Sequence, residues 1–344
     1  MLKNFSNPLP GVPSVESPFF DLLFDPSDRD YAVAKQLNEK GFAVLDFPDE
    51  GILETVEAIK DNLCARYDWD AWRSGKEAGL RIQDAWMFDE NVRKVATHPN
   101  ILSLLSRLYG RQAWPFQTLN FPVGTQQHFH TDSVHFSSIP ERFMCGVWLA
   151  LEDIDLDQGP LVYYPGSHRW PIYTNEHIGR RHSERYQSNQ TDFEDMWRQL
   201  VAVQGVEPER LKIKKGSALI WASNLLHGGD IHLNKDKTRW SQVTHYYFDD
   251  CAYYTPMNSD PALGVVQFRR PWNIITGEPA SNWYVGQAIS DEFVAFTSPS
   301  RNALAGFEPS AYLEANPDVA AAGVDPLEHY TLQGLKERRP LKKV

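Results

Sequence analysis

The chain has 344 residues, with 34 basic against 45 acidic side chains and a formal net charge of −11. At about 150 residues per domain this length predicts one large domain or two unequal ones, and the 42% of hydrophobic residues can build a core, which excludes global disorder. Nucleic-acid affinity comes largely from Lys and Arg that neutralise phosphates, so the acidic balance argues against a nucleic-acid partner.

A cytoplasmic protein without a membrane span is expected. The sequence contains no run of about 18 apolar residues, which a transmembrane helix would need. Four prolines interrupt residues 1–20, where a signal peptide requires a continuous apolar stretch. The three cysteines, Cys64, Cys145 and Cys251, are far apart and odd in number, which argues against a disulfide scaffold or a cysteine-based zinc site.

The first third of the chain is predicted to be mainly helical. Residues 1–27, rich in Pro and Phe and without a clear period, are interpreted as an N-terminal arm on the surface of the body. From Asp28 a helical spacing of apolar residues runs to Gly41, and the strand-like segment FAVLDF follows. Residues 50–66 and 99–109 show the helical pattern again.

Short strands are predicted from Trp114 to Phe248. Runs such as FQTLNF, CGVWLALED, PLVYYPG, GSALIW and SQVTHYYF are rich in Val, Tyr, Trp and Phe and alternate with Gly, Pro, Asp and Asn. This texture indicates a sandwich or barrel, and we place the body at residues 28–250. Residues 170–210 form a polar insertion long enough to act as a lid over a cavity mouth.

Two further segments follow the body. Residues 251–306 have weak periodicity and many Pro, Asn, Ser and Gly, so we interpret them as irregular wrapping and linker. Residues 307–344 show helical segments separated by prolines, which predicts a small C-terminal helical module.

The motif GTQQHFHTDSVHF carries the strongest chemical signal. His130 and Asp132 lie two residues apart in an apparent strand, so both side chains should point to the same face. His227 follows 97 residues later, just past another apolar strand. Two histidines and one carboxylate on one side of an iron ion leave its other positions open, as oxygen-activating sites require.

Other histidines compete for the same interpretation. His128 shares the strand face of His130, so the register alone leaves both as candidate ligands. His245 shares a strand face with Arg239 and Ser241, and we expect it to be a hydrogen-bonded core histidine. His168, in the PGSH turn, is expected to serve backbone geometry.

From about Gly41 to Phe248 the chain resembles the phytanoyl-CoA dioxygenase family of iron(II)- and 2-oxoglutarate-dependent oxygenases. The segments that carry the resemblance are QQHFHTD, GVWLALEDID, GPLVYYPGSH and LLHGG, with Arg239 and Ser241 downstream. The resemblance implies a double-stranded β-helix, which is a jelly-roll, cupin-like barrel. The predicted fold class is therefore mainly β with flanking helices around such a core, plus the C-terminal helical module.

The resemblance also implies a role for individual residues. His130, Asp132 and His227 would bind Fe(II), and Arg239 with Ser241 would bind the distal carboxylate of 2-oxoglutarate. A planar bidentate guanidinium suits such a carboxylate. Trp148 and Gln117 occupy positions that border the cosubstrate in the family.

The activity implied is hydroxylation of a C–H bond of a small molecule, with 2-oxoglutarate and O2 as cosubstrates and succinate and CO2 as products. Some relatives desaturate, cyclise or epimerise instead. Related halogenases replace the carboxylate ligand with Gly or Ala, whereas this chain keeps Asp132, which favours hydroxylation.

The C-terminal segment YLEANPDVAAAGVDPLEHYTLQG resembles a short NPDV-type module that accompanies bacterial glycosyltransferases and polysaccharide enzymes. This likeness implies a tethering role toward a protein partner and points to a sugar or glycan precursor as substrate, beside a lipid-like one. Two alternatives stay open: a catalytically silent jelly-roll protein that binds carbohydrate or protein, and a metal-dependent isomerase of cupin type, which would not need Arg239 and Ser241.

Overall fold

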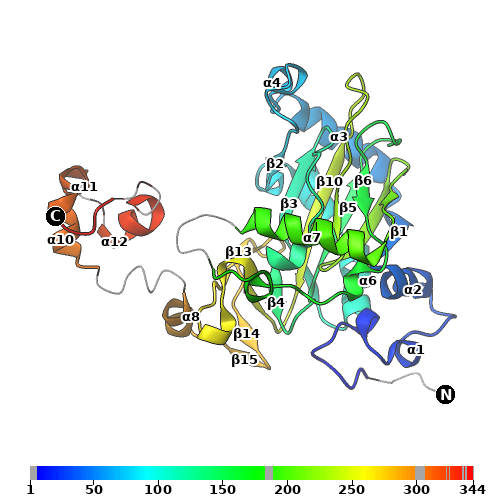
Figure 1. Cartoon of the computed structure of the whole chain (residues 1–344). Helices are drawn as coiled ribbons and strands as arrows, with labels where there is room; N and C mark the ends of the chain where they lie inside the picture. The colour runs from blue at the N-terminus through cyan, green and yellow to red at the C-terminus, as the bar shows by residue number, and fades with distance from the viewer. Residues whose placement is uncertain are drawn as a thin grey trace.

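Antiparallel strands form the centre of the protein, and helices cover one face of the main sheet (Figure 1). The computed structural model describes residues 6–182, 189–298, 307–322, 324, 326–334, 337 and 339–343. The α-helices are α1 (Phe20–Leu23), α2 (Tyr31–Lys40), α3 (Ile52–Cys64), α4 (Trp69–Arg73), α5 (Glu90–Ala96), α6 (Pro99–Tyr109), α7 (Gln190–Gln204), α8 (Asp291–Thr297), α10 (Pro309–Ala315), α11 (Pro317–Ala322) and α12 (Pro326–His329).

Six strands form the main sheet in the order β1-β8-β5-β10-β3-β2, and every neighbouring pair is antiparallel. Their bounds are β1 (Phe42–Asp46), β2 (Ile82–Gln83), β3 (Ala113–Phe121), β5 (Met144–Ala150), β8 (Ser217–Ala222) and β10 (Ser241–Phe248). A smaller sheet has the order β7-β6-β9, from β6 (Leu161–Tyr163), β7 (Glu209–Arg210) and β9 (His227–Gly229).

Strand alternation divides the core into two layers. In β5, Cys145, Val147 and Leu149 pack with the helices, whereas Trp148 and Ala150 face the space between the two sheets. That inner layer also contains residues of the smaller sheet, among them Leu161 and Tyr163. The two sheets thus enclose one apolar interior, and the predicted double-stranded β-helix with flanking helices is confirmed.

The insertion packs through apolar residues of α7. Phe193 and Trp197 are buried against Tyr164 and Leu226, so this helix packs on the body through an apolar contact. Residues 183–188 of the predicted insertion lie outside the described residues.

Residues 251–298 are more regular than we expected. Strand β11 (Ala252–Tyr254) pairs with β4 (Ser137–Ile139), and two hairpins follow, β12 (Trp272–Asn273) with β13 (Glu278–Pro279) and β14 (Trp283–Tyr284) with β15 (Gln287–Ala288). Strands of two or three residues are too short to show a period of two in the sequence. The segment therefore belongs to the body at least through β11.

The C-terminal helices form a small apolar cluster of their own. Tyr312, Val319 and Tyr330 are buried together. The Asn316 side chain, from the NPDV motif, donates hydrogen bonds to the carbonyls of Tyr312 and Pro340, at 2.9 Å each. The motif asparagine thus ties the helices to the last turn of the chain, and the tethering role of the module stays a prediction.

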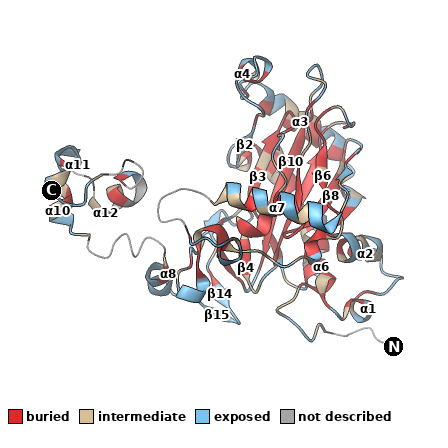
Figure 2. Cartoon of the chain, in the orientation of Figure 1, coloured by how far each residue is buried: buried red, intermediate tan, exposed pale blue. Residues whose placement is uncertain are grey.

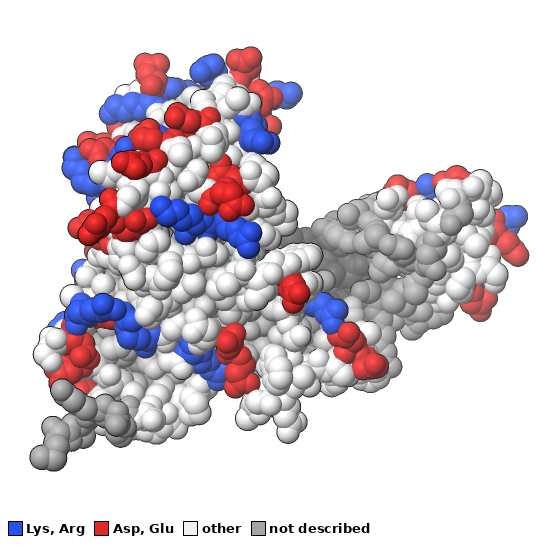
Figure 3. All heavy atoms as spheres, turned by 180° about the vertical axis from the view of Figure 1, so that it is seen from behind, with Lys and Arg blue, Asp and Glu red and all other residues white. Residues whose placement is uncertain are grey.

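The strands of the body are buried and the outer faces of the helices are exposed (Figure 2). On the face shown in Figure 3, basic and acidic side chains are interspersed over the upper part of the body. Within the described residues, no helix combines the length and the apolar character needed to cross a bilayer.

Candidate metal centre and its cavity

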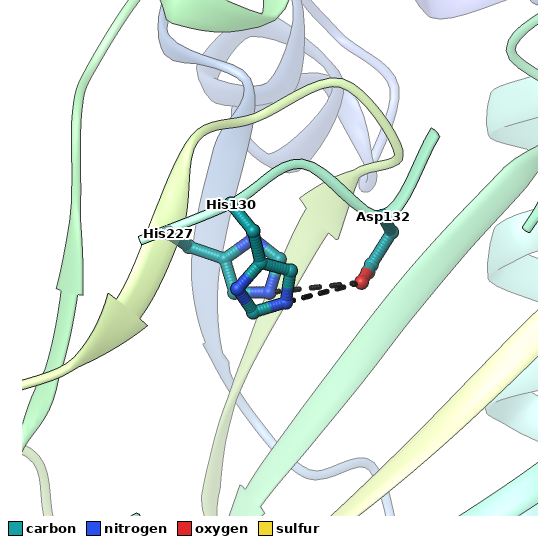
Figure 4. Close-up of side chains that lie close together, drawn as sticks. All are labelled: His130, Asp132 and His227. Atoms are coloured by element: carbon teal, nitrogen blue, oxygen red, sulfur yellow. Dashed lines mark ion pairs between the residues drawn. The ribbon is translucent and has the colours of Figure 1, made fainter. Parts of the chain in front are cut away.

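His130, Asp132 and His227 converge inside the barrel. Each offers one ligand atom, and these three atoms lie within 4.8 Å of one another. The Oδ1 atom of Asp132 is 3.8 Å from His130 Nε2 and 3.9 Å from His227 Nε2, and Figure 4 shows the two imidazoles side by side and facing the carboxylate. All three residues are at most 7% exposed.

A backbone bridge, and not a continuous strand, brings the two histidines together. His130 and His227 exchange backbone hydrogen bonds of 2.8 and 2.9 Å in an isolated antiparallel pair. The predicted strand through His130 and Asp132 is therefore wrong, because Asp132 already begins a 3-10 turn, Asp132–Val134. The turn, and not strand alternation, directs the carboxylate toward the rings.

Gly228 permits this bridge. A Cβ atom at Gly228 would lie 2.8 Å from the carbonyl oxygen of Gln127 and 2.9 Å from the backbone nitrogen of Phe129. The segment before His130 therefore crosses directly over the glycine that follows His227. This close approach explains why LLHGG has glycine after its histidine.

Hydrogen bonds fix which nitrogen of each histidine is free. His130 Nδ1 lies 3.0 Å from the His128 carbonyl oxygen, and His227 Nδ1 lies 3.0 Å from the Leu225 carbonyl oxygen. A carbonyl only accepts hydrogen bonds, so each Nδ1 carries the proton and donates. With Nδ1 donating to a carbonyl, Nε2 is the nitrogen that each ring directs toward Asp132 and can offer to a metal.

The two oxygens of Asp132 have separate surroundings. Oδ1 faces the two rings, whereas Oδ2 accepts a 2.7 Å hydrogen bond from Trp221 Nε1 and lies 3.7 Å from His245 Nε2. Trp221 lies in this position because its partner on β5 is Gly146, where a Cβ would approach the indole to 2.2 Å. A carboxylate held through one oxygen leaves the other free to bind a cation.

The protonation states suit metal binding. Burial, followed by the neighbouring His227, lowers the pKa of His130 to about 3, so this ring is neutral near pH 7. Burial acts to raise the pKa of Asp132, but the three histidines and the Trp221 hydrogen bond outweigh it and hold the pKa below its usual value. A neutral ring and an ionised carboxylate are both ready to act as ligands.

Arg239 is a buried cation on which the acidic Glu152 acts only from beyond ion-pair distance. It is 2% exposed, its Nε donates to the Gly159 carbonyl at 3.0 Å, and its Nη1 donates to Ser241 Oγ at 2.8 Å. Burial lowers its pKa to about 10, so it stays charged at neutral pH. Among the described residues none forms an ion pair with this guanidinium, an arrangement that calls for an anionic ligand.

Arg239 and the metal-ligand candidates line one cavity of about 640 Å³. Trp148 and Gln117 line it as well. The Trp148 ring lies 5.6 Å from the Arg239 guanidinium, and Gln117 Oε1 lies 2.9 Å from His245 Nδ1. The structure thus brings all seven residues predicted from the sequence to one cavity or, for Ser241, into direct contact with a residue that lines it.

The cavity mouth differs from the predicted one. None of the described residues from 170–182 and 189–210 lines the cavity, whereas Thr255, Gln267, Arg269 and Arg270 do. Helix α7 is anchored beside the site by Phe193 and Trp197 in an apolar contact and so contributes no lining side chain. Residues 255–271, which we had interpreted as wrapping, form part of the wall.

The remaining histidines have other partners. His128 Nδ1 donates to the Phe129 carbonyl at 2.8 Å, and its Nε2 lies 3.2 Å from Arg198 Nη2 on α7. His168 is 1% exposed and its Nε2 lies 3.1 Å from the Asn38 carbonyl oxygen, which agrees with the expected structural role. His245, through Gln117 and Asp132, borders the metal-ligand candidates more closely than a core residue would.

Sequence reasoning did not identify Trp221, Arg81 or Arg269 as site residues. Trp221 stood in a strand-like run, where an aromatic residue usually indicates core. Its one signal was the alternation with Leu219, which places both residues on the inner face. No local pattern marked the two arginines, because their place in the cavity depends on contacts between distant segments.

The donor set fits iron(II). Two neutral imidazole nitrogens and one carboxylate oxygen on one side of an ion are the ligands of non-haem iron oxygenases, and they leave positions for a bidentate keto acid and O2. The buried, unpaired guanidinium in the same cavity fits the second carboxylate of that acid.

Comparisons with known proteins agree with this geometry. The family described as Phytanoyl-CoA dioxygenase matches residues 38–239, more than half of the chain. A Caenorhabditis elegans protein described as a probable phytanoyl-CoA dioxygenase is 26% identical over 134 residues, 36% of this chain and 42% of that protein. The chain thus spans less than half the length of this curated relative.

Similar solved structures include the non-haem α-ketoglutarate-dependent carbocyclase SnoK from nogalamycin biosynthesis, with TM-score 0.53, 16% identity and coverage of 74% of this chain and 94% of SnoK. EctD from S. alaskensis, with 2-oxoglutarate and 5-hydroxyectoine, has TM-score 0.53, 18% identity and coverage of 78% and 90%. At such identities these likenesses show the shared fold. Because the family matches across the motif region, the chain belongs to the phytanoyl-CoA dioxygenase family of iron(II)- and 2-oxoglutarate-dependent oxygenases.

Proposed function

We propose that this chain is an iron(II)- and 2-oxoglutarate-dependent dioxygenase that hydroxylates a C–H bond of a small molecule and releases succinate and CO2. The observation that carries the proposal is the buried, unpaired Arg239 in the same cavity as the His130, Asp132 and His227 cluster. A metal site alone would not need this guanidinium, so a cupin-type isomerase leaves Arg239 without a role.

In this proposal each side chain has a defined task. His130, Asp132 and His227 hold Fe(II), and Trp221 fixes the carboxylate through the oxygen that faces away from the rings. Arg239 and Ser241 bind the distal carboxylate of 2-oxoglutarate. Trp148 forms an apolar wall beside the cosubstrate, and Gln117 orients His245.

Iron with 2-oxoglutarate and O2 supplies the oxidising power for hydroxylation, and the protein supplies position and shelter. Trp148, Phe121 and Val243 line the inner cavity with apolar surface, which excludes water from the reacting centre. A volume of about 640 Å³ is in the range of small-molecule sites, and we propose a sugar or glycan precursor or a lipid-like molecule as substrate.

The test adds Fe(II) and 2-oxoglutarate to the protein without O2 and measures the weak visible charge-transfer band of the chelate. O2 is then admitted, and the release of succinate is measured. Asp132→Ala should abolish both signals, since it removes a charged ligand from a preformed pocket. Arg239→Gln should raise the 2-oxoglutarate concentration for half-saturation at least tenfold, because a charged hydrogen bond contributes about 1.5–3 kcal/mol.

His177→Gln serves as the matched control, because His177 is exposed and does not line the cavity. It should leave the band and the succinate yield at wild-type values. A wild-type protein without the band, or an Asp132→Ala protein that still produces succinate at the wild-type rate, would overturn the proposal and favour a catalytically silent binding protein.

A further inference from the structure

The cavity is positively charged although the whole chain carries −11. Four arginines line it, Arg81, Arg239, Arg269 and Arg270, and Asp132 is the single acidic side chain among the described lining residues. Building on the proposed function, we infer that the substrate carries an anionic group, a carboxylate or a phosphate, that Arg269 and Arg81 bind at the cavity mouth.

Hydrogen bonds fix the main chain of Arg269, and its guanidinium has N–H groups that remain available to a ligand. Its backbone N–H donates to the Tyr253 carbonyl at 2.7 Å, and its carbonyl accepts from Asn282 Nδ2 at 3.0 Å, which fixes the main chain. The guanidinium lies 4.8 Å from the Phe136 ring, and its Nη1 donates to Thr255 Oγ1 at 3.2 Å. Its Nε is buried and has no hydrogen-bond partner among the described residues.

The partners of Arg269 are all neutral. Within the described part of the chain no carboxylate lies within ion-pair distance of it, although the guanidinium is only partly exposed. A half-buried cation surrounded by an aromatic ring and a hydroxyl keeps an unmatched charge. The fixed main chain and the aromatic support preorganise that charge for an anion.

Two aromatic rings connect Arg269 to the metal-ligand candidates. The Phe136 ring that supports it is 5.3 Å from the ring of His245, whose Nε2 is 3.7 Å from Asp132 Oδ2. An anionic group on Arg269 would therefore hold the substrate in the cavity that the metal-ligand candidates line.

Arg81 and Arg270 differ in how their charge is matched. Arg81 precedes β2 at the sheet edge and makes no hydrogen bond or ion pair with another described residue. Arg270, next to Arg269 in the chain, forms an ion pair with Asp291. The neighbouring arginine thus provides a natural comparison, because it lines the same mouth with its charge already neutralised.

A count of the charges in the cavity leaves Arg81 and Arg269 without an opposite charge. Fe(II) would be matched by Asp132 and by the metal-binding carboxylate of 2-oxoglutarate, and Arg239 by the distal carboxylate. Arg270 is matched by Asp291, so two positive charges remain, those of Arg81 and Arg269. Two unmatched guanidinium groups in the lining of one cavity suit a phosphate monoester or a carboxylate, both of which accept bidentate hydrogen bonds.

The experiment uses probe pairs that differ in charge: butanoate against butanamide, and n-butyl phosphate against 1-butanol. Each is titrated by calorimetry into the full chain loaded with Fe(II) and saturating 2-oxoglutarate without O2, so that Arg239 is occupied. The charged probe of at least one pair should bind about tenfold more tightly than its uncharged partner. Which pair shows the larger difference separates carboxylate from phosphate.

The variants assign the preference to residues. Arg269→Gln and Arg81→Gln should each reduce the preference for the charged probe severalfold, whereas Arg270→Gln should keep it. Arg81 is exposed, so its variant tests the inference even if Arg269→Gln disturbs folding. Equal binding of charged and uncharged probes in both pairs, or a preference unchanged in Arg269→Gln and Arg81→Gln, would overturn the inference. If the protein lacks the charge-transfer band but still prefers the charged probe, the proposed function is wrong and the anion site stands.

Discussion

Trp221 Nε1 donates a 2.7 Å hydrogen bond to the Oδ2 atom of Asp132, from a strand that contributes no metal-ligand candidate of its own. The indole is 2% exposed, so the bond is shielded from water. This contact orients the carboxylate so that Oδ1 faces both histidines.

Trp221→Phe should therefore weaken Fe(II) binding roughly 10- to 100-fold, the usual effect of removing a residue that orients a metal ligand. The control variant below removes the same ring volume, so a difference between the two variants reports the loss of the hydrogen bond that orients the carboxylate. Anaerobic titration with Fe(II) measures the change. Trp197→Phe changes another fully buried tryptophan, which belongs to α7 and packs in the apolar contact between that helix and the body. It is the matched control and should bind Fe(II) like the wild type.

Gly146→Ala should destabilise the fold and the site together. The added Cβ would lie 2.2 Å from Trp221 Cε2, so the indole or strand β5 must shift. Overpacking of this kind costs about 1–3 kcal/mol, which urea denaturation resolves. Gly51→Ala places its Cβ in ordinary contact, 3.6 Å from Asp49 Oδ1, and should show a much smaller loss. Equal stability of the two variants would contradict the packing argument.

Metal binding should stabilise the folded chain and should distinguish the two candidate histidines. Free Fe(II) at about 100 times its Kd adds about 2.7 kcal/mol, which appears as a rise in melting temperature that a chelator reverses. His130→Gln should lose this rise. His128→Gln should keep it, because both nitrogens of His128 already have protein partners. The opposite pattern would make His128 the ligand.

His168 should make stability depend on pH. Burial lowers its pKa from 6.5 to about 4. Between about pH 6.5 and pH 4 the imidazole is therefore protonated in the unfolded chain and neutral in the folded chain. The stabilising contribution is complete above pH 6.5 and is lost as the pH falls toward 4, by about 2–3 kcal/mol at pH 4.5.

Urea denaturation of the wild type and of His168→Gln at pH 7.5 and 4.5 measures this contribution. The variant should lose less stability on acidification than the wild type does. His177→Gln, which removes an exposed histidine, controls for the loss of an imidazole. Parallel losses in wild type and His168→Gln would show that another group is responsible.

The sequence by itself determined the fold class and the ligand types. Short runs rich in Val, Tyr, Trp and Phe between Gly, Pro, Asp and Asn are a local property of the chain, and they predicted the strands β5, β8 and β10. The residues His130, Asp132 and His227 indicated a metal site, and the family resemblance of the segments around them and Arg239 implied the iron and 2-oxoglutarate chemistry.

Only the tertiary structure decided how these residues are held and what else reaches the cavity. The bridge between His130 and His227 joins residues 97 positions apart, and the hydrogen bond from Trp221 to Asp132 joins residues 89 positions apart. The contact of Arg269 with Phe136 joins residues 133 positions apart. Such contacts depend on the crossing of distant backbones, which no local periodicity encodes, and for that reason the cavity wall came from residues 255–271 and not from the predicted lid.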